Sequence, residues 1–191
     1  MAVSMYQASV PVFRHMLGSL NTLLDKAAAH AAAKGYDPGN LVRSRLTPDM
    51  MPLAQQGQVA TNHATGGAAR LAGLEPPVIG EDERTIEEMQ ARIGRAITFL
   101  DSLRPEQIDG SEDRLITLAR RKEVPHLRLA GLPQVQPALS LYPMTFRGAD
   151  YLFSFAMPNF YFHVVTAYAI LRQAGVEIGK HDYLGPLKRA D

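Results

Sequence analysis

The amino-acid sequence predicts an all-α (mainly) protein, a four-helix bundle with a small β-hairpin or long loop between its third and fourth helices. Apolar residues recur at steps of three and four in four separate segments, the spacing of one helical face. Each segment ends at glycine or proline. Residues 111–147 break this rhythm, and the 191 residues suit a single domain, 1–191. Four helices joined by polar connections favour a bundle.

The first two helices are predicted over residues 6–33 and 52–73. Gly35 should stop the first, because helices commonly end at a left-handed glycine. The second contains Gly57, Gly66 and Gly67. Each weakens the helix by up to about 1 kcal/mol against alanine. We expect these small residues to let a neighbouring helix approach closely.

The third helix has the clearest start signal. Thr85 is followed three residues later by Glu88, which is the pattern of a capping box, and Pro105 closes the segment. Residues 116–119 and 139–146 then predict two strands of a small hairpin. The stretch between the strands, about 120–138, is rich in arginine and proline and is predicted to be a surface loop insertion.

The fourth helix is predicted over residues 150–174. It is apolar almost all round, which is typical of the most buried helix of a bundle. Pro158 should kink it or split it in two.

Composition excludes several classes of protein. Twenty basic and nineteen acidic residues leave a formal charge of +1, whereas nucleic-acid binders usually show a basic excess. The chain has no cysteine, which removes disulfides and thiol nucleophiles and fits a cytoplasmic protein. We see no signal peptide and no membrane span. We therefore expect neither a nucleic-acid nor a membrane partner.

The most informative residue is His163, which lies with Asn159 and Thr166 on a polar line inside the apolar fourth helix. Buried polar groups need partners, which can be side chains, water, a ligand or a metal. Two interpretations stay open: a core histidine with a hydrogen bond across the bundle, and a histidine that serves a binding site.

His63 is the other histidine expected to face inward, and it lies beside Gln56 on the second helix. Because facing helices are where bundles build metal sites, His63 and His163 could meet. A third protein ligand is not evident, although catalytic zinc sites usually have three. His15 and His30 lie opposite the apolar face of the first helix and are expected to be exposed.

Several stretches together resemble a known family. In order, they are SVPVF from Ser9, RLTPDM from Arg45 followed by Pro52-Leu53, ARLAG from Ala69, PNFYFH from Pro158 with AYAILR from Ala167, and GVEIGK from Gly175. They resemble an uncharacterised bacterial family of unknown function within the DinB/YfiT-like four-helix-bundle superfamily. The resemblance implies a DinB-like bundle that is often a homodimer. It also implies a superfamily metal pattern of one histidine on the second helix and two, four residues apart, on the fourth.

His63 and His163 match two of those positions, but Ala167 occupies the third. The resemblance leaves two functions open. One is a metal-dependent enzyme, of thiol transferase or hydrolase type, with an incomplete metal triad of His63 and His163 and a divalent Zn, Ni, Mn or Fe ion. The other is a non-catalytic, homodimeric, small-ligand-binding or stress-related protein without metal. In either case, the expected ligand-binding residues are Gln56, Asn159, His163, Thr166 and Tyr168.

Overall fold

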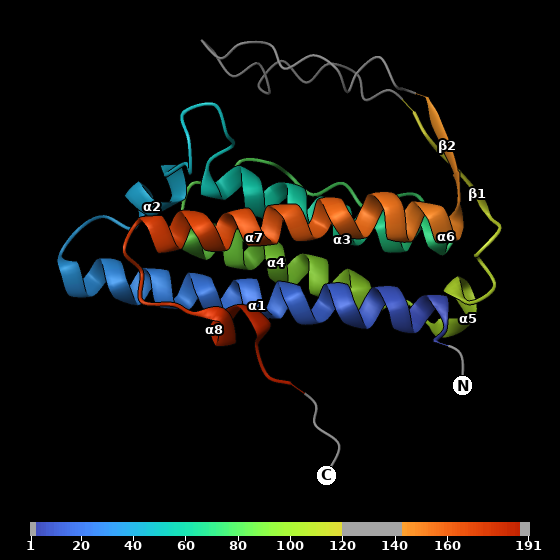
Figure 1. Cartoon of the computed structure of the whole chain (residues 1–191), viewed down its shortest axis with the longest axis horizontal. Helices are drawn as coiled ribbons and strands as arrows, with labels where there is room; N and C mark the ends of the chain where they lie inside the picture. Colours follow the sequence, from blue (N-terminus) through green and yellow to red (C-terminus); the bar gives the residue numbers. More distant parts are fainter. Residues whose placement is uncertain (1–2, 120–142, 188–191) are drawn as a thin grey trace.

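The computed structural model describes residues 3–119 and 143–187. Its long helices lie side by side (Figure 1). They are α1 (Met5–Lys34), α3 (Leu53–Leu71), α4 (Ile86–Asp101) and α7 (Met157–Gln173). Two short helices, α2 (Gly39–Arg43) and α5 (Pro105–Ile108), lie in the connections. The predicted four-helix bundle is confirmed.

Two helix ends, the start of α4 and the end of α1, lie at the predicted capping residues. The Thr85 hydroxyl accepts a hydrogen bond from the Glu88 amide, and the Glu88 carboxylate accepts one from the Thr85 amide, which completes the capping box. Gly35 ends α1 in the left-handed conformation, with φ of 70°, and its amide donates to carbonyls of the last turn. Both signals act over a few residues, which is why the sequence alone could predict them.

The helix α3 packs more extensively against α7 than against any other element. Small residues make this possible: a side chain at Gly67 would meet Ala156 and Phe13 at 3.4 Å. Phe13 of α1 in turn packs edge-on against the buried Phe160 of α7, with 5.0 Å between ring centroids. The predicted close approach of a neighbouring element is confirmed at Gly67 and at Gly57, where a side chain would meet Met89 of α4 at 3.0 Å, but not at Gly66.

The predicted fourth helix is built from three consecutive pieces. A turn of α-helix, α6 (Gly148–Asp150), continues into the π-helix η3 (Tyr151–Ala156) and then into α7. Pro158 lies just after the point where the π-helix gives way to α-helix, so the helix changes type at the predicted position. This helix is apolar almost all round, as predicted, but its outer face is not buried: Phe162 and Val165 are 57% and 47% exposed.

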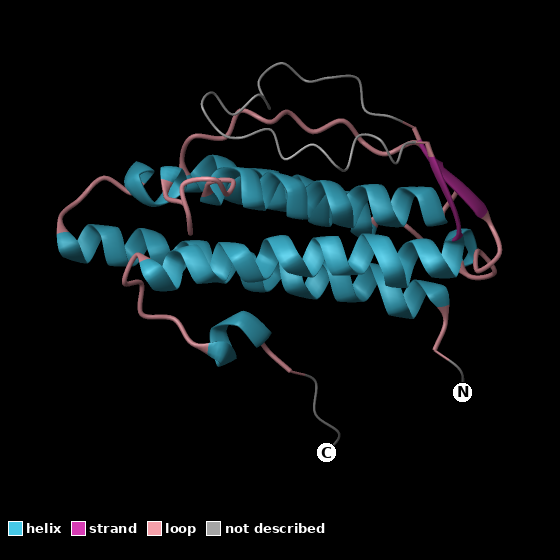
Figure 2. Ribbon diagram, turned by 45° about the horizontal axis from the view of Figure 1, so that its top comes forward, coloured by secondary structure: helices cyan, strands magenta, loops and turns pink. Residues whose placement is uncertain are grey.

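A two-stranded antiparallel hairpin closes the end of the bundle at which α1 begins (Figure 2). Its strands are β1 (Leu115–Leu118) and β2 (Met144–Arg147), with Leu115 paired to Arg147. The expected hairpin is therefore present, with its first strand shifted by one residue. The expected loop 120–138 and residues 139–142 of the expected second strand lie outside the described residues. Directly after β2, Gly148 lies so close to Ser111 that a side chain at Gly148 would overlap the Ser111 carbonyl oxygen.

A last short helix, α8 (Lys180–Leu184), packs against α1 (Figure 1). Lys26 and Asp182 form an ion pair of 2.6 Å, and the His15 Nε2 lies 2.7 Å from the Leu184 carbonyl oxygen. His15 and His30 are half-buried rather than exposed, because the segments after their own helix return to cover them: α8 reaches His15, and Tyr36 packs edge-on against His30.

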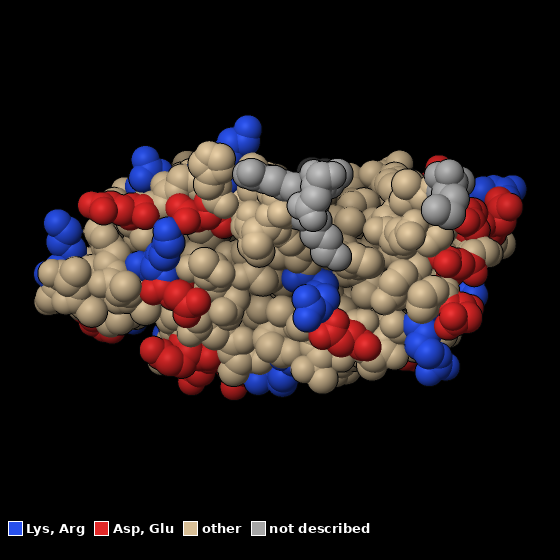
Figure 3. All heavy atoms as spheres, turned by 90° about the horizontal axis from the view of Figure 1, so that it is seen from below, with Lys and Arg blue, Asp and Glu red and all other residues tan. Residues whose placement is uncertain are grey.

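Charged side chains of both signs are interspersed over the face seen in Figure 3, as the near-zero net charge predicts. Among the described residues, no helix is long and apolar enough to cross a membrane.

Candidate functional site

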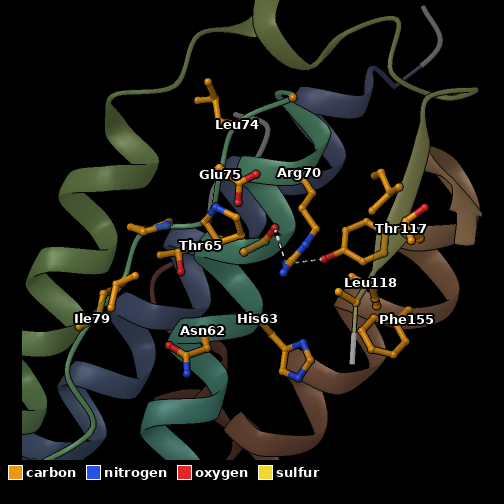
Figure 4. A pocket seen from close by; sticks show the side chains of 18 of the residues that line it. Asn62, His63, Thr65, Arg70, Leu74, Glu75, Ile79, Thr117, Leu118 and Phe155 are labelled. Carbon is orange, nitrogen blue, oxygen red and sulfur yellow. Dashed lines mark hydrogen bonds between the residues drawn. The ribbon is translucent and has the colours of Figure 1, made fainter. Parts of the chain in front are cut away.

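A cavity of about 860 Å³ opens beside α3. Its walls are the outer face of α3, the α3–α4 connection (residues 72–85), the strand β1 and two aromatic residues of η3 (Figure 4). The polar side chains that α3 contributes to it are Asn62, His63, Thr65 and Arg70. We call this cavity the α3 pocket. The π-helix η3 forms part of the wall of this pocket, and π-helical turns occur frequently at functional sites.

A hydrogen bond with Gln56 fixes the tautomer of His163. Its Nδ1 lies 2.7 Å from Gln56 Oε1, and the Gln56 Nε2 donates to the Met51 carbonyl oxygen at 3.0 Å. Because the second bond fixes which end of the amide is the nitrogen, the oxygen faces His163 and the His163 Nδ1 carries the hydrogen. The His163 Nε2 therefore has the lone pair.

The structure brings His63 and His163 together. Their ring centroids are 5.9 Å apart and the ring planes are inclined by only 13°. His63 also contacts Phe155, with 5.9 Å between ring centroids, and lines the α3 pocket (Figure 4). His63 makes no hydrogen bond with any group in the described part of the chain.

Both imidazoles are neutral at physiological pH. Burial is the main reason that the pKa of His63 falls from its ordinary 6.5 to about 4, and repulsion from His163 and Arg70 lowers it further. Burial also lowers the pKa of His163 to about 4. Each neutral ring has one donor nitrogen and one acceptor nitrogen.

The remaining expected ligand residues lie elsewhere. Asn159 Nδ2 donates to the Phe155 carbonyl oxygen and Thr166 Oγ1 to the Phe162 carbonyl oxygen, both at 2.7 Å and both within their own helix. The ring of Tyr168 packs edge-on against Tyr183 of α8, with 5.9 Å between centroids. None of these three residues lines the α3 pocket, and neither do His163 and Gln56. Of the expected site residues, only His63 lies on the pocket wall.

The donor set does not fit the metal site that the superfamily pattern implies. Two imidazoles are in place, but Gln56 Oε1 already accepts from His163, and the third position is the buried Ala167. Within residues 3–119 and 143–187, no group of three or more His, Cys, Asp or Glu side chains could hold a metal ion. A catalytic zinc site usually has three protein ligands.

Among the pocket residues that the sequence did not mark as site residues, Arg70 and Tyr151 contact each other. The Arg70 Nη1 donates to the Gly66 carbonyl oxygen at 3.0 Å and to the Tyr151 hydroxyl at 3.2 Å (Figure 4). Arg70 lies in the last turn of α3, where a basic residue is ordinary, so only the contact with Tyr151 marks it as part of the site.

A buried ion pair secures the α3–α4 connection that forms one pocket wall. Arg92 of α4 is 1% exposed, and its Nη1 lies 3.1 Å from Glu83 and donates to the Gly80 carbonyl oxygen. The same guanidinium donates to Thr61 and to Asn62 Oδ1 on α3, each at 2.6 Å. Arg92 therefore joins α4, α3 and the connection in one hydrogen-bonded network.

The fold is that of a DinB-like helical bundle. The chain is similar to a solved structure of a DinB family member protein from Shewanella denitrificans, with 33% sequence identity and a TM-score of 0.80. The match covers 97% of this chain and 94% of the other. The sequence pattern of the domain of unknown function DUF1993 matches residues 5–132 and 134–184, and the chain belongs to this family. No curated protein matches the chain.

Proposed function

We propose that this DinB-like protein binds a small organic molecule, without a metal, in the α3 pocket. The pocket volume of about 860 Å³ lies within the range of small-molecule sites, which are mostly apolar with a few convergent polar groups. Apolar side chains of the α3–α4 connection, β1 and η3 line part of this pocket. Polar side chains come from α3 and also from residues outside it, namely Glu75, Glu81, Arg114 and Thr117.

One observation carries the proposal: His63 is a half-buried, neutral imidazole on the pocket wall without a hydrogen-bond partner among the described residues. A polar group withdrawn from bulk water normally finds a partner, and leaving it unpaired costs about 1–3 kcal/mol. A ligand that donates to or accepts from His63 would remove that cost.

The six histidines of the chain supply the test. We would follow their imidazole C2–H signals by NMR while adding a library of small aromatic fragments with acidic, basic and neutral members. A ligand of the α3 pocket should shift the signals of His63 and His163 and leave those of His15 and His181 in place. If no fragment moves the His63 signal selectively, the proposal fails.

The second candidate function is a metal-dependent enzyme of thiol transferase or hydrolase type. It is favoured by the Gln56–His163 hydrogen bond, because metal-bound histidines commonly have their other ring nitrogen held in this way. Elemental analysis of untagged protein, beside its His163→Ala variant, separates the two candidates. Near-stoichiometric metal that is lost in the variant would favour the enzyme over the metal-free binding protein.

We also propose that the protein is a homodimer through the outer face of α7. Phe162 and Val165 are exposed there at the spacing of one helical face, and contiguous exposed apolar side chains often mark interaction surfaces. Light scattering of Phe162→Glu should give a monomer, whereas Gln173→Glu on the same helix should leave the mass of the wild type. A monomeric wild type would contradict this proposal.

A further inference from the structure

We infer that the ligand of the α3 pocket is a planar aromatic carboxylate, with its carboxylate bound by Arg70 and its ring lying against Phe155 and His63. This inference rests on the function proposed above and adds the chemical class of the ligand.

The first support is a cation without a counter-ion. Arg70 is half-buried and lines the pocket, and both of its hydrogen bonds go from Nη1 to neutral oxygens, those of Gly66 and Tyr151. No carboxylate of the described residues lies within ion-pair distance of it. A guanidinium stays protonated at all ordinary pH values, and a partly buried charge is costly unless it is paired.

The second support is the geometry of the unused donors. A guanidinium has five N–H groups, and those on Nε and Nη2 form one edge of the planar fork. Because Arg70 uses only Nη1, this edge remains available, and it matches the two oxygens of a carboxylate in a bidentate pair. The neutral ring of His63, on the same wall, carries no positive charge with which to pair a carboxylate.

The acidic residues of the pocket do not take the place of a ligand. Glu81 accepts a hydrogen bond of 2.8 Å from Asn62, and Glu75 is exposed at the rim. The other arginine on the wall, Arg114, donates to the Leu71 carbonyl oxygen and likewise has no ion-pair partner among the described residues. Two unpaired guanidinium groups therefore face one pocket, and they favour an anion.

The third support is the aromatic wall beside Arg70. Tyr151 and Phe155 stack at 5.9 Å between centroids with planes inclined by 20°, and Phe146 lies 5.5 Å from Phe155. Phe155 also contacts the neutral ring of His63, which lies in the same pocket (Figure 4). Stacked and tilted ring contacts are the arrangement that aromatic pairs prefer, so a flat apolar body would extend this wall.

The test compares two probes of nearly the same shape, 2-naphthoate and its neutral amide 2-naphthamide, by calorimetry and by the His63 NMR signal. Hydrogen bonds to a charged group contribute about 1.5–3 kcal/mol, so the acid should bind the wild type at least about tenfold more tightly than the amide. Arg70→Gln should abolish this preference. Arg172→Gln, which changes an exposed arginine at the far end of α7, should keep it.

Arg70→Lys keeps the charge and loses the fork, so it should retain a reduced preference and serves if the glutamine variant unfolds. Equal binding of the two probes to the wild type, or a preference that survives Arg70→Gln, would overturn the inference. If only neutral or cationic fragments shift the His63 signal, the binding site stands and the carboxylate inference falls. If no fragment shifts that signal, the proposed function falls with it.

Discussion

Acid should destabilise this protein through its pair of buried imidazoles. Both His63 and His163 have a pKa of about 4 in the folded chain against 6.5 ordinarily, so between these values the unfolded chain binds protons that the folded chain does not. Stability is then fully present above pH 6.5 and is lost as the pH falls toward 4. At pH 5.0, about 1.5 pH units below the unfolded pKa, each ring lowers the free energy of unfolding by about 2 kcal/mol.

The assay is urea unfolding at pH 7.5 and pH 5.0, with the difference in unfolding free energy taken for each protein against itself. His63→Phe keeps an aromatic ring beside Phe155 and removes one titrating group. Its loss of stability between the two pH values should therefore be about 2 kcal/mol smaller than that of the wild type. His181→Gln, at an exposed position on α8, should behave like the wild type.

Comparing each protein with itself cancels any constant effect of the substitution on stability. The reasoning is refuted if the wild type and His63→Phe lose the same stability within about 0.5 kcal/mol, or if NMR titration gives His63 a pKa near 6.5.

Three further substitutions test the packing around the site. Arg92→Met removes the buried ion-pair partner of Glu83, which keeps only the exposed Arg95 at 3.6 Å and a hydrogen bond from Gln58. The unfolding free energy should fall by up to about 3–5 kcal/mol, and adding Glu83→Gln should restore part of the loss. Gln56→Leu removes the hydrogen bonds to the His163 ring and the Met51 carbonyl and should cost about 1–3 kcal/mol by denaturant unfolding. Gly148→Ala should also destabilise, by thermal unfolding, because its methyl group would overlap a backbone oxygen; an unchanged midpoint would contradict this contact.

The helices could be predicted from the sequence because their signals are local. The three-and-four spacing of apolar residues and the cap at Thr85 depend on residues within one or two turns. The hairpin was also predictable, since residues 111–147 lack that spacing. The bounds of β2 were less so, because pairing with β1 rather than local sequence sets where the strand begins.

The candidate site was predicted only in part, for a physical reason. His63 and His163 could be paired because each stands out as polar on an apolar helix. Arg70 acquires its role from Tyr151, which is distant in sequence, so no local pattern marks it.

Asn159 and Thr166 were predicted to bind a ligand, but they do not line the pocket. Both are polar within an apolar helix, but each satisfies its side chain with a carbonyl oxygen of the preceding turn and needs no ligand.

The lack of a third histidine is built into the packing rather than confined to one side chain. Ala167 is fully buried in the core cluster, four residues after His163. Close-packed interiors tolerate added volume poorly, so an imidazole there would strain the core before it could reach a metal. The same closeness of helices that α3 gains from its glycines thus works against a three-ligand centre. What remains is a neutral pair of rings beside an unpaired guanidinium, and this arrangement suits recognition of an organic anion better than activation of a metal-bound water.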